Sequence, residues 1–237
     1  MKLFTTIKAN SSRIDYKNFQ TIDIEGETPL WKWSIQRLMS DKYEIFVNTD
    51  SGIILDEISD MKNVYGIKRK EKHIEWEKNA EQIGSPGESM LFEFCNDKSI
   101  SPEEVICTFH VTSPFTTLEL IEEASKYLKM GYDSVQSVQK IQNFVFEMKN
   151  EKIVPINYNC SFIQRTQDLK PLYASIAAFF ISTKSKILRD KKRIPGKVFN
   201  YELDALRSVE IDYPDDLKLS RLVVNSMLEY QRKYGVV

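Results

Sequence analysis

The fold is decided by residues 105–128, which read VICTFHVTSPFTTLELIEEASKYL. The opening run, Val105–His110, is mostly apolar and β-prone, which is typical of a buried strand. Apolar residues then recur at helical spacing within Leu120–Leu128. Thr116 and Glu119 have the spacing of a capping box, so we expect the helix to begin there. A strand followed directly by a helix is the repeating unit of α/β proteins.

Two similar strand–helix pairs precede this one. Lys2–Ile7 and Glu44–Asn48 are β-prone, and apolar residues at helical spacing follow in Trp31–Met39 and Ile54–Met61. Strands that alternate with helices of this length predict an α/β domain with a parallel sheet covered on both faces.

The second half of the chain has a different pattern. Short β-prone pieces separated by polar turns predict a β-rich excursion at about 135–172, which would cap the site or form a dimer contact. Ser175–Ile181 is almost wholly apolar and predicts a central strand, and Ser208–Ile211 predicts a last short strand. Pro214 then opens a long amphipathic helix. The whole chain, 1–237, is interpreted as a single domain.

Composition excludes several classes of protein. The 237 residues include 33 Lys and Arg against 34 Asp and Glu, which argues against a general nucleic-acid binder. The three cysteines, Cys95, Cys107 and Cys160, form no zinc pattern and favour a reduced cytoplasmic protein. The apolar run Ile176–Ile181 is far too short to span a membrane, and Met1–Ile7 lacks the apolar core of a signal peptide.

The loops that follow strands are the expected places for ligands in such a sheet. The first of them contains small polar and cationic residues: Asn10, Ser11, Ser12, Arg13, Lys17 and Asn18. Their hydroxyl and backbone N–H groups could hold a phosphate that the cations neutralise, although a solvated polar loop is the alternative. The chain contains no GxGxxG and no P-loop motif, which excludes an ordinary dinucleotide fold and a P-loop NTPase.

Three further segments could contact a ligand. Asp50 follows the second strand and could orient a ligand or cap the next helix. The hydroxyl-rich loop His110–Thr117 suits an anionic or polyhydroxyl ligand, or simply caps its helix. The basic cluster Lys68–Lys72 and the stretch from it to Pro86 predict a solvated loop or lid, with phosphate binding as the alternative.

Two carboxylates near the C-terminus suggest a cation site. On a strand, Glu210 and Asp212 would point to the same side and form a hard-cation site suited to Mg²⁺ bound to phosphates. The alternative, an acidic start to the last helix, accounts for Asp215 and Asp216 but leaves the first pair unexplained.

Taken together, the loops resemble those of the acylneuraminate cytidylyltransferases, the CMP-sialic acid synthetase-like family. The resemblance runs over nearly the whole chain and in the same order. It is carried by Lys17-Asn18, by Thr28-Pro29-Leu30 with Trp33, by Asn48-Thr49-Asp50-Ser51, by the loop His110–Thr117, by Asp133-Ser134-Val135-Gln136-Ser137-Val138, by Arg165–Pro171, and by Glu210–Leu217.

The resemblance implies a nucleotide-diphospho-sugar-transferase-like, Rossmann-like three-layer sandwich with a mixed, mostly parallel sheet. It also implies a homodimer in which the excursion at 135–172 reaches across to the other copy. The reaction would join CTP to an acidic 2-keto sugar, a nonulosonic or Kdo-type acid, giving a CMP-sugar for surface polysaccharides and pyrophosphate, with Mg²⁺. No nucleic-acid or membrane partner is expected.

The resemblance also implies roles for individual residues. Lys17 and Asp212 would be catalytic, and Glu210 and Asp212 would hold Mg²⁺. The nucleotide would contact the opening loop, namely Asn10, Ser11, Ser12, Arg13, Lys17 and Asn18, together with Asp50 and Arg69. The sugar would contact His110, Thr112, Ser113, Arg165, Gln167 and Tyr173.

The chain departs from the family pattern at several of these positions. Its opening loop is about two residues shorter, His110 replaces a glutamine, Thr116 replaces an arginine, and Glu210 replaces the first metal-binding aspartate. These departures leave two alternatives to an active cytidylyltransferase. One is a non-catalytic dimeric homologue that binds a ligand or partner, and the other is a nucleotidyltransferase with a different base or acceptor.

Overall fold

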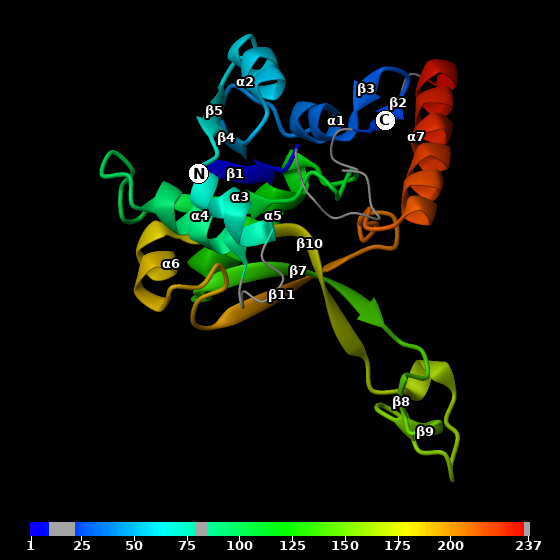
Figure 1. Ribbon diagram of the computed structural model, residues 1–237. Coiled ribbons are helices and arrows are strands. Elements are labelled where there is room, and N and C mark those ends of the chain that lie inside the picture. Colours follow the sequence, from blue (N-terminus) through cyan, green and yellow to red (C-terminus); the bar gives the residue numbers. More distant parts are fainter. Residues whose placement is uncertain (10–21, 79–84, 235–237) are drawn as a thin grey trace.

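The computed structural model describes residues 1–9, 22–78 and 85–234. Its centre is a seven-stranded sheet with the order β11-β7-β10-β6-β1-β4-β5 (Figure 1). The strands are β1 (Lys2–Ile7), β4 (Glu44–Thr49), β5 (Val64–Lys68), β6 (Val105–Phe109), β7 (Ser134–Ile141), β10 (Leu172–Thr183) and β11 (Val198–Leu203). β10 runs antiparallel to both of its neighbours, and the other adjacent pairs in this sheet are parallel. The expected mixed, mostly parallel sheet is therefore confirmed.

Helices cover both faces of the sheet. They are α1 (Leu30–Gln36), α2 (Gly52–Ser59), α3 (Glu71–Lys78), α4 (Pro86–Cys95), α5 (Leu118–Lys129), α6 (Lys184–Asp190) and α7 (Pro214–Tyr234). Successive residues of a strand face opposite sides. Accordingly, Leu3 packs in one core with α1, α2 and α5, whereas Phe4 packs in a second core with α4 and α6. The result is the expected three-layer sandwich.

A third, smaller core attaches the last helix to the body. α7 packs against the short hairpin of β2 (Asp23–Glu25) and β3 (Thr28–Pro29), beside which it stands in Figure 1. Ile24 and Leu30 from this region meet Ile211, Leu217 and Val224 in a buried cluster. The C-terminal end of the chain is thereby folded back onto its N-terminal third.

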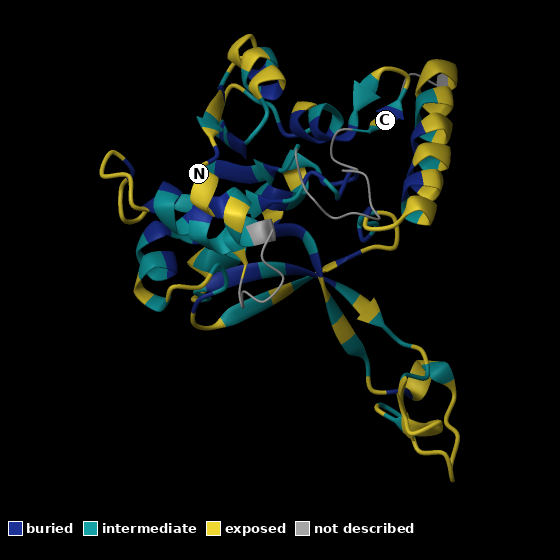
Figure 2. Cartoon of the chain, in the orientation of Figure 1, coloured by how far each residue is buried: buried dark blue, intermediate teal, exposed yellow. Residues whose placement is uncertain are grey.

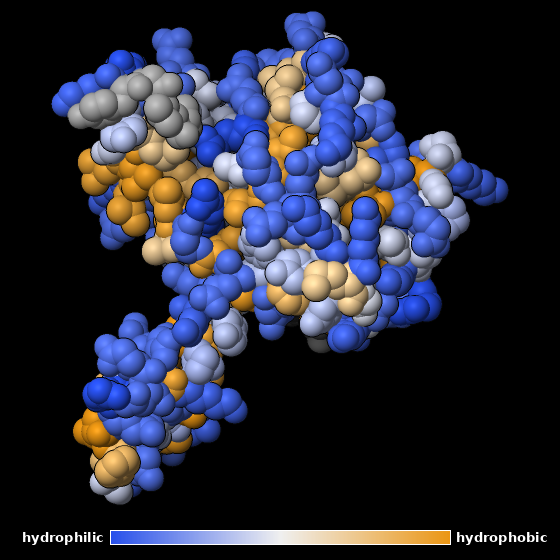
Figure 3. All heavy atoms as spheres, turned by 180° about the vertical axis from the view of Figure 1, so that it is seen from behind, coloured by the Kyte–Doolittle hydropathy of each residue, from blue (hydrophilic) through white to orange (hydrophobic). Residues whose placement is uncertain are grey.

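The expected excursion is a projecting arm, which we define as residues 142–171. The distal parts of β7 and β10 carry it away from the body, and it contains the hairpin of β8 (Phe146–Lys149) and β9 (Lys152–Pro155) (Figure 1). Most of the arm is exposed (Figure 2), and apolar side chains gather at its far end (Figure 3). The exposed apolar residues of the arm are Phe146, Met148, Ile153, Val154, Ile156, Phe162 and Ile163.

The predicted strand Ser208–Ile211 is wrong. The edge strand of the sheet is β11, Val198–Leu203, which pairs in parallel with β7. Ser208 instead closes a turn, donating its N–H to the carbonyl of Asp204 at 2.9 Å. The N–H of Ile211 is bonded to Thr112, so residues 209–212 follow a loop rather than a strand ladder.

Two local predictions are also corrected. The fifth helix begins at Leu118 after Thr117, and Thr116 is buried and closes a turn with Ser113, so its side chain forms no capping box. The basic segment after β5 is partly helical rather than an open loop, because α3 packs against α4. No helix in the described parts of the chain is long and apolar enough to cross a membrane.

Candidate active site

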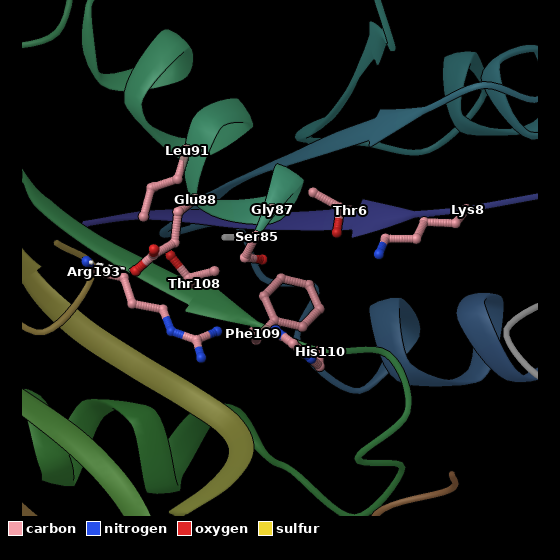
Figure 4. A pocket seen from close by; sticks show the side chains of 10 residues that line it. All are labelled: Thr6, Lys8, Ser85, Gly87, Glu88, Leu91, Thr108, Phe109, His110 and Arg193. Atoms are coloured by element: carbon pink, nitrogen blue, oxygen red, sulfur yellow. Dashed lines mark hydrogen bonds between the residues drawn. The ribbon is translucent and has the colours of Figure 1, made fainter. Parts of the chain in front are cut away.

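A pocket opens at the carboxyl ends of β1 and β6, where ligands bind in open α/β sheets. Its empty volume, with the open mouth included, is about 570 Å³. The walls come from β1, β6, the first turns of α4 and the loop after α6 (Figure 4). The lining residues are Thr6, Lys8, Ser85, Gly87, Glu88, Leu91, Thr108, Phe109, His110 and Arg193.

His110 contributes an uncharged ring to this pocket. It follows the last residue of β6 and meets the ring of Phe180 edge-on, with 6.2 Å between the ring centroids. Burial lowers the pKa of His110 to about 4, and the positive charges of Arg193 and Lys8 add to this effect. The imidazole is therefore neutral near pH 7 and can both donate and accept a hydrogen bond. The structure thus places this predicted sugar-binding residue in the pocket.

Arg193 lines the same pocket and contacts the same Phe180 ring as His110. Its Cζ lies over the Phe180 ring, 4.0 Å from the centroid, in a cation–π contact. Figure 4 shows this guanidinium extending into the pocket between Glu88 and His110. Burial lowers the pKa of Arg193, and the carboxylates of Glu88 and Glu210 counteract this shift. Arg193 therefore lies close enough to both Glu88 and Glu210 for their charges to stabilise its own.

The acidic pair is brought to this region by one backbone contact. The N–H of Ile211 donates to the carbonyl of Thr112 at 2.8 Å, which fastens the segment to the loop after β6. The Glu210 carboxylate accepts a 3.3 Å hydrogen bond from the N–H of Ala177. Burial raises the pKa of Glu210, and the neighbouring charge of Asp212 raises it further. The two carboxylates are thus close enough to repel each other.

These carboxylates fit a magnesium ion that keeps other ligands. Mg²⁺ is usually held by one or two carboxylates together with substrate phosphates and waters. The described residues contain no group of three or more acidic, histidine or cysteine side chains placed to hold a metal. A cation beside Glu210 and Asp212 would relieve their mutual repulsion and that of a bound phosphate. The donor set therefore suits a metal that arrives with its substrate.

The loop after β6 is held rigidly from the side of α1. The indole N–H of Trp33 donates to the carbonyl of Pro114 at 3.0 Å, and the hydroxyl of Ser34 donates to Val111 at 2.7 Å. Of the predicted sugar contacts here, Ser113 is buried, and its hydroxyl has no hydrogen-bond partner among the described residues. Thr112 contributes its carbonyl to the contact with the acidic segment. Neither residue lines the pocket wall.

The two predicted nucleotide contacts outside the opening loop have structural partners. A carboxylate oxygen of Asp50 accepts the N–H of Ala9 at 2.7 Å and so positions the start of the opening loop. The helix cap considered for Asp50 is provided instead by Ser51, which accepts the N–H of Ile54. Arg69 is buried beside α3, where its guanidinium donates to the carbonyl of His73 at 3.0 Å. Arg69 does not line the pocket.

The remaining predicted residues fall in two places. The opening-loop residues lie outside the described residues: Asn10, Ser11, Ser12, Arg13, Lys17 and Asn18. Arg165 and Gln167 lie on the arm, and Tyr173 lies at its base, away from the pocket of the same chain (Figure 1). Arg165 is exposed and bonded to Asp168 at 2.8 Å.

The three charged residues that line the pocket were not selected from the sequence. Lys8 directly follows β1, Glu88 lies in the first turn of α4, and Arg193 ends a run of three basic residues after α6. Such a basic run normally indicates a solvated surface. Of these three residues, only Lys8 could have been predicted from the sequence, because it directly follows a strand.

Comparisons with known proteins find relatives in sequence and in fold. No protein-family model matches the chain. The chain is 30% identical over 187 residues to the N-acylneuraminate cytidylyltransferases of Streptococcus agalactiae serotypes III, Ia and V. The match covers 77% of this chain and 43% of those proteins, so the chain spans less than half the length of the curated relatives it matches.

Solved structures share the fold at low sequence identity. The 2-C-methyl-D-erythritol 4-phosphate cytidylyltransferase of Francisella tularensis superimposes with a TM-score of 0.64 at 8% identity, over 93% of this chain and 98% of that one. A CMP:2-keto-3-deoxy-manno-octonic acid synthetase complexed with CTP gives 0.62 at 12% identity, over 95% and 98%. The expected resemblance to the acylneuraminate cytidylyltransferases is therefore confirmed over less than half of the length of those proteins, and the chain shares its fold with solved cytidylyltransferases and a CMP-sugar synthetase.

Proposed function

We propose that this chain is a cytidylyltransferase that transfers CMP from CTP to an acidic 2-keto sugar and releases pyrophosphate. The observation that carries the proposal is the 2.8 Å bond from Ile211 to Thr112. It joins the acidic pair to the loop after β6, although these segments are far apart in sequence. A carboxylate pair for a cation and a small-molecule pocket thereby meet at the ligand-binding edge of the sheet.

The reaction requires the protein to position the two substrates rather than to form a covalent intermediate with them. The anomeric hydroxyl of the sugar attacks the α-phosphorus of CTP, a new P–O bond forms, and the bond to the pyrophosphate oxygen breaks. The hydroxyl loses its proton, and negative charge builds up on the leaving pyrophosphate. Catalysis therefore depends on aligning the two substrates and on cations placed around the phosphates.

Residues at the strand ends would provide this alignment. Asp50 holds the backbone of Ala9, from which the opening loop with Lys17 and Asn18 continues. We assign the neutralisation of the phosphates to Lys17. Glu210 and Asp212 would hold Mg²⁺, which when bound supplies charge stabilisation on the phosphate oxygens.

The acidic nature of the acceptor is supported by the pocket and by the relatives. Among the lining residues the two cations Lys8 and Arg193 outnumber the one carboxylate, Glu88, and His110 adds no charge near pH 7 because burial lowers its pKa. The curated relatives are named for N-acylneuraminate. An anionic sugar is therefore the acceptor class that this site favours.

The arm supports a homodimer. Its hairpin exposes apolar residues such as Ile153, which is 54% exposed in the single chain. Burying such residues against a second copy would be favourable by about 25 cal/mol per Å² of apolar surface. The predicted sugar contacts Arg165, Gln167 and Tyr173 would then reach the pocket of the other copy.

Calorimetric titration of the four nucleotides tests the proposed activity. We expect CTP to bind in preference to ATP, GTP and UTP, and more tightly with Mg²⁺ than with a chelator. Asp212→Asn should remove most of the gain from Mg²⁺. Asp215→Asn is the matched control, because Asp215 is exposed and paired only with Lys218 in the described structure.

Two outcomes would contradict the proposal. Selective binding of another nucleotide would refute the cytidylyl assignment. No nucleotide binding, with or without candidate sugar acids, would favour a non-catalytic homologue.

A further inference from the structure

Arg193 has an unusual environment for a partly buried cation. Within the described part of the chain, its guanidinium forms no ion pair within 4 Å and no side-chain hydrogen bond that would hold it. Its contacts are the Phe180 ring, 4.0 Å from Cζ, and the pocket itself. The backbone N–H of Arg193 donates to the Glu88 carboxylate at 3.4 Å, which anchors the loop without involving the guanidinium.

An unpaired guanidinium in a partly dry site is costly. Arginine presents five N–H donors and stays charged under all ordinary conditions, so its loss of water needs compensation. Glu88 and Glu210 lie near enough to favour the charged form, but neither is in ion-pair contact with Arg193. The cation–π contact with Phe180 holds the guanidinium at the pocket, and its planar fork can bind an anion in a bidentate way.

We propose that Arg193, with Lys8 on the opposite side of the pocket, binds the anionic group of the acceptor substrate, a carboxylate or a phosphate. This inference rests on the proposed function in taking the ligand to be the acceptor of cytidylyl transfer. The two cations come from distant parts of the chain, β1 and the loop after α6. The neutral ring of His110 between these walls donates or accepts one hydrogen bond without adding charge.

The histidines provide a test that needs no turnover. The chain has two, His110 in the pocket and His73 buried outside it. We would record the ring resonances of ¹³C-labelled histidine while adding inorganic phosphate or pyruvate, a small 2-keto carboxylate. We expect saturable shifts of the His110 resonances and none of the His73 resonances. The probe that binds more tightly, phosphate or pyruvate, identifies whether the site prefers a phosphate or a carboxylate.

Variants at two adjacent positions make the test specific. Arg193→Gln should weaken binding of the probe by about tenfold or more, as expected for losing charged hydrogen bonds. Lys192→Gln removes the same charge from an exposed neighbour and should leave binding within about twofold. Arg193→Lys, which keeps the charge but loses the fork, should be intermediate. The unchanged His73 signal shows that each variant is folded.

The outcomes separate this inference from the proposed function. No saturable shift of His110 with either anion, or equal effects of the two glutamine variants, would overturn the role of Arg193 even if CTP binds. An Arg193-dependent shift without CTP binding would support the anion site and refute cytidylyl transfer. Where the wild type turns over an acceptor, Arg193→Gln should raise the KM for that acceptor about 10–100-fold and leave the KM for CTP within about twofold.

Discussion

Replacing Ser137 by alanine should weaken both the fold and the acidic site, because one buried hydroxyl organises the bulge of β10. The register between β7 and β10 shifts between Ser175 and Phe180. Within this irregular stretch, Ser137 Oγ accepts the N–H of Phe179 at 3.0 Å and donates to the carbonyl of Ile176 at 2.6 Å. A bulge leaves backbone groups without ladder partners, and this side chain takes their place.

The magnitude follows from the groups left without partners. Ser137 is fully buried, so alanine would leave a backbone N–H and a carbonyl unsatisfied in the core. Each such group costs about 1–3 kcal/mol, and local relaxation reduces the sum, so we expect a loss of about 2–3 kcal/mol. For a chain of this size, the melting temperature should fall by about 5–10 °C.

The Ser137→Ala substitution should also disturb the cation site proposed at Glu210 and Asp212. The bulge presents the N–H of Ala177 to the carboxylate of Glu210 at 3.3 Å. Loosening the bulge should therefore weaken Mg²⁺-dependent CTP binding about 2–10-fold, the value of one hydrogen bond. If Ser137→Ala lowers the stability but leaves Mg²⁺-dependent CTP binding unchanged, Ser137 supports the fold and not the cation site.

Urea unfolding at constant pH measures the stability loss, with Ser175→Ala as the control. Ser175 lies on the neighbouring strand, β10, but is exposed, so its change should stay within about 0.5 kcal/mol. If the two alanine variants differ by less than about 0.5 kcal/mol, the argument from the buried hydroxyl is wrong.

Two further predictions follow from burial. The folded-state pKa of His110, about 4, is below the unfolded value near 6.5, so the unfolded chain binds more protons between these values and stability falls as the pH drops through this window. Relative to His110→Gln, the wild type should lose up to about 3 kcal/mol of unfolding free energy between pH 7 and pH 4, and parallel curves in urea would contradict this. For the arm, light scattering should show a wild-type dimer that Ile153→Asp converts to monomer and Lys152→Asp does not; a wild-type monomer at micromolar concentration would rule the dimer out.

The layers of the fold were predictable because they depend on local patterns. The apolar residues of Lys2–Ile7 and Val105–His110 mark buried strands, and helical spacing after them marks the covering helices. The excursion was also visible, since short β-prone pieces interrupt the alternation. Ser208–Ile211 was misassigned because its β-prone residues find a loop partner, Thr112, instead of a strand. The β-propensity of a segment does not depend on such a distant partner and therefore cannot predict it.

The sequence predicted which loops contribute to the site but not which of their side chains face the pocket. The sequence by itself determined that His110 and the acidic pair follow strands or precede a helix, because these positions depend on chain order alone. Only the tertiary structure decided that Arg193 faces the pocket and that Arg69 is buried away from it. The physical reason is that burial and charge pairing of a side chain depend on elements distant in sequence. A basic residue on a surface and one aimed into a pocket have the same local sequence pattern.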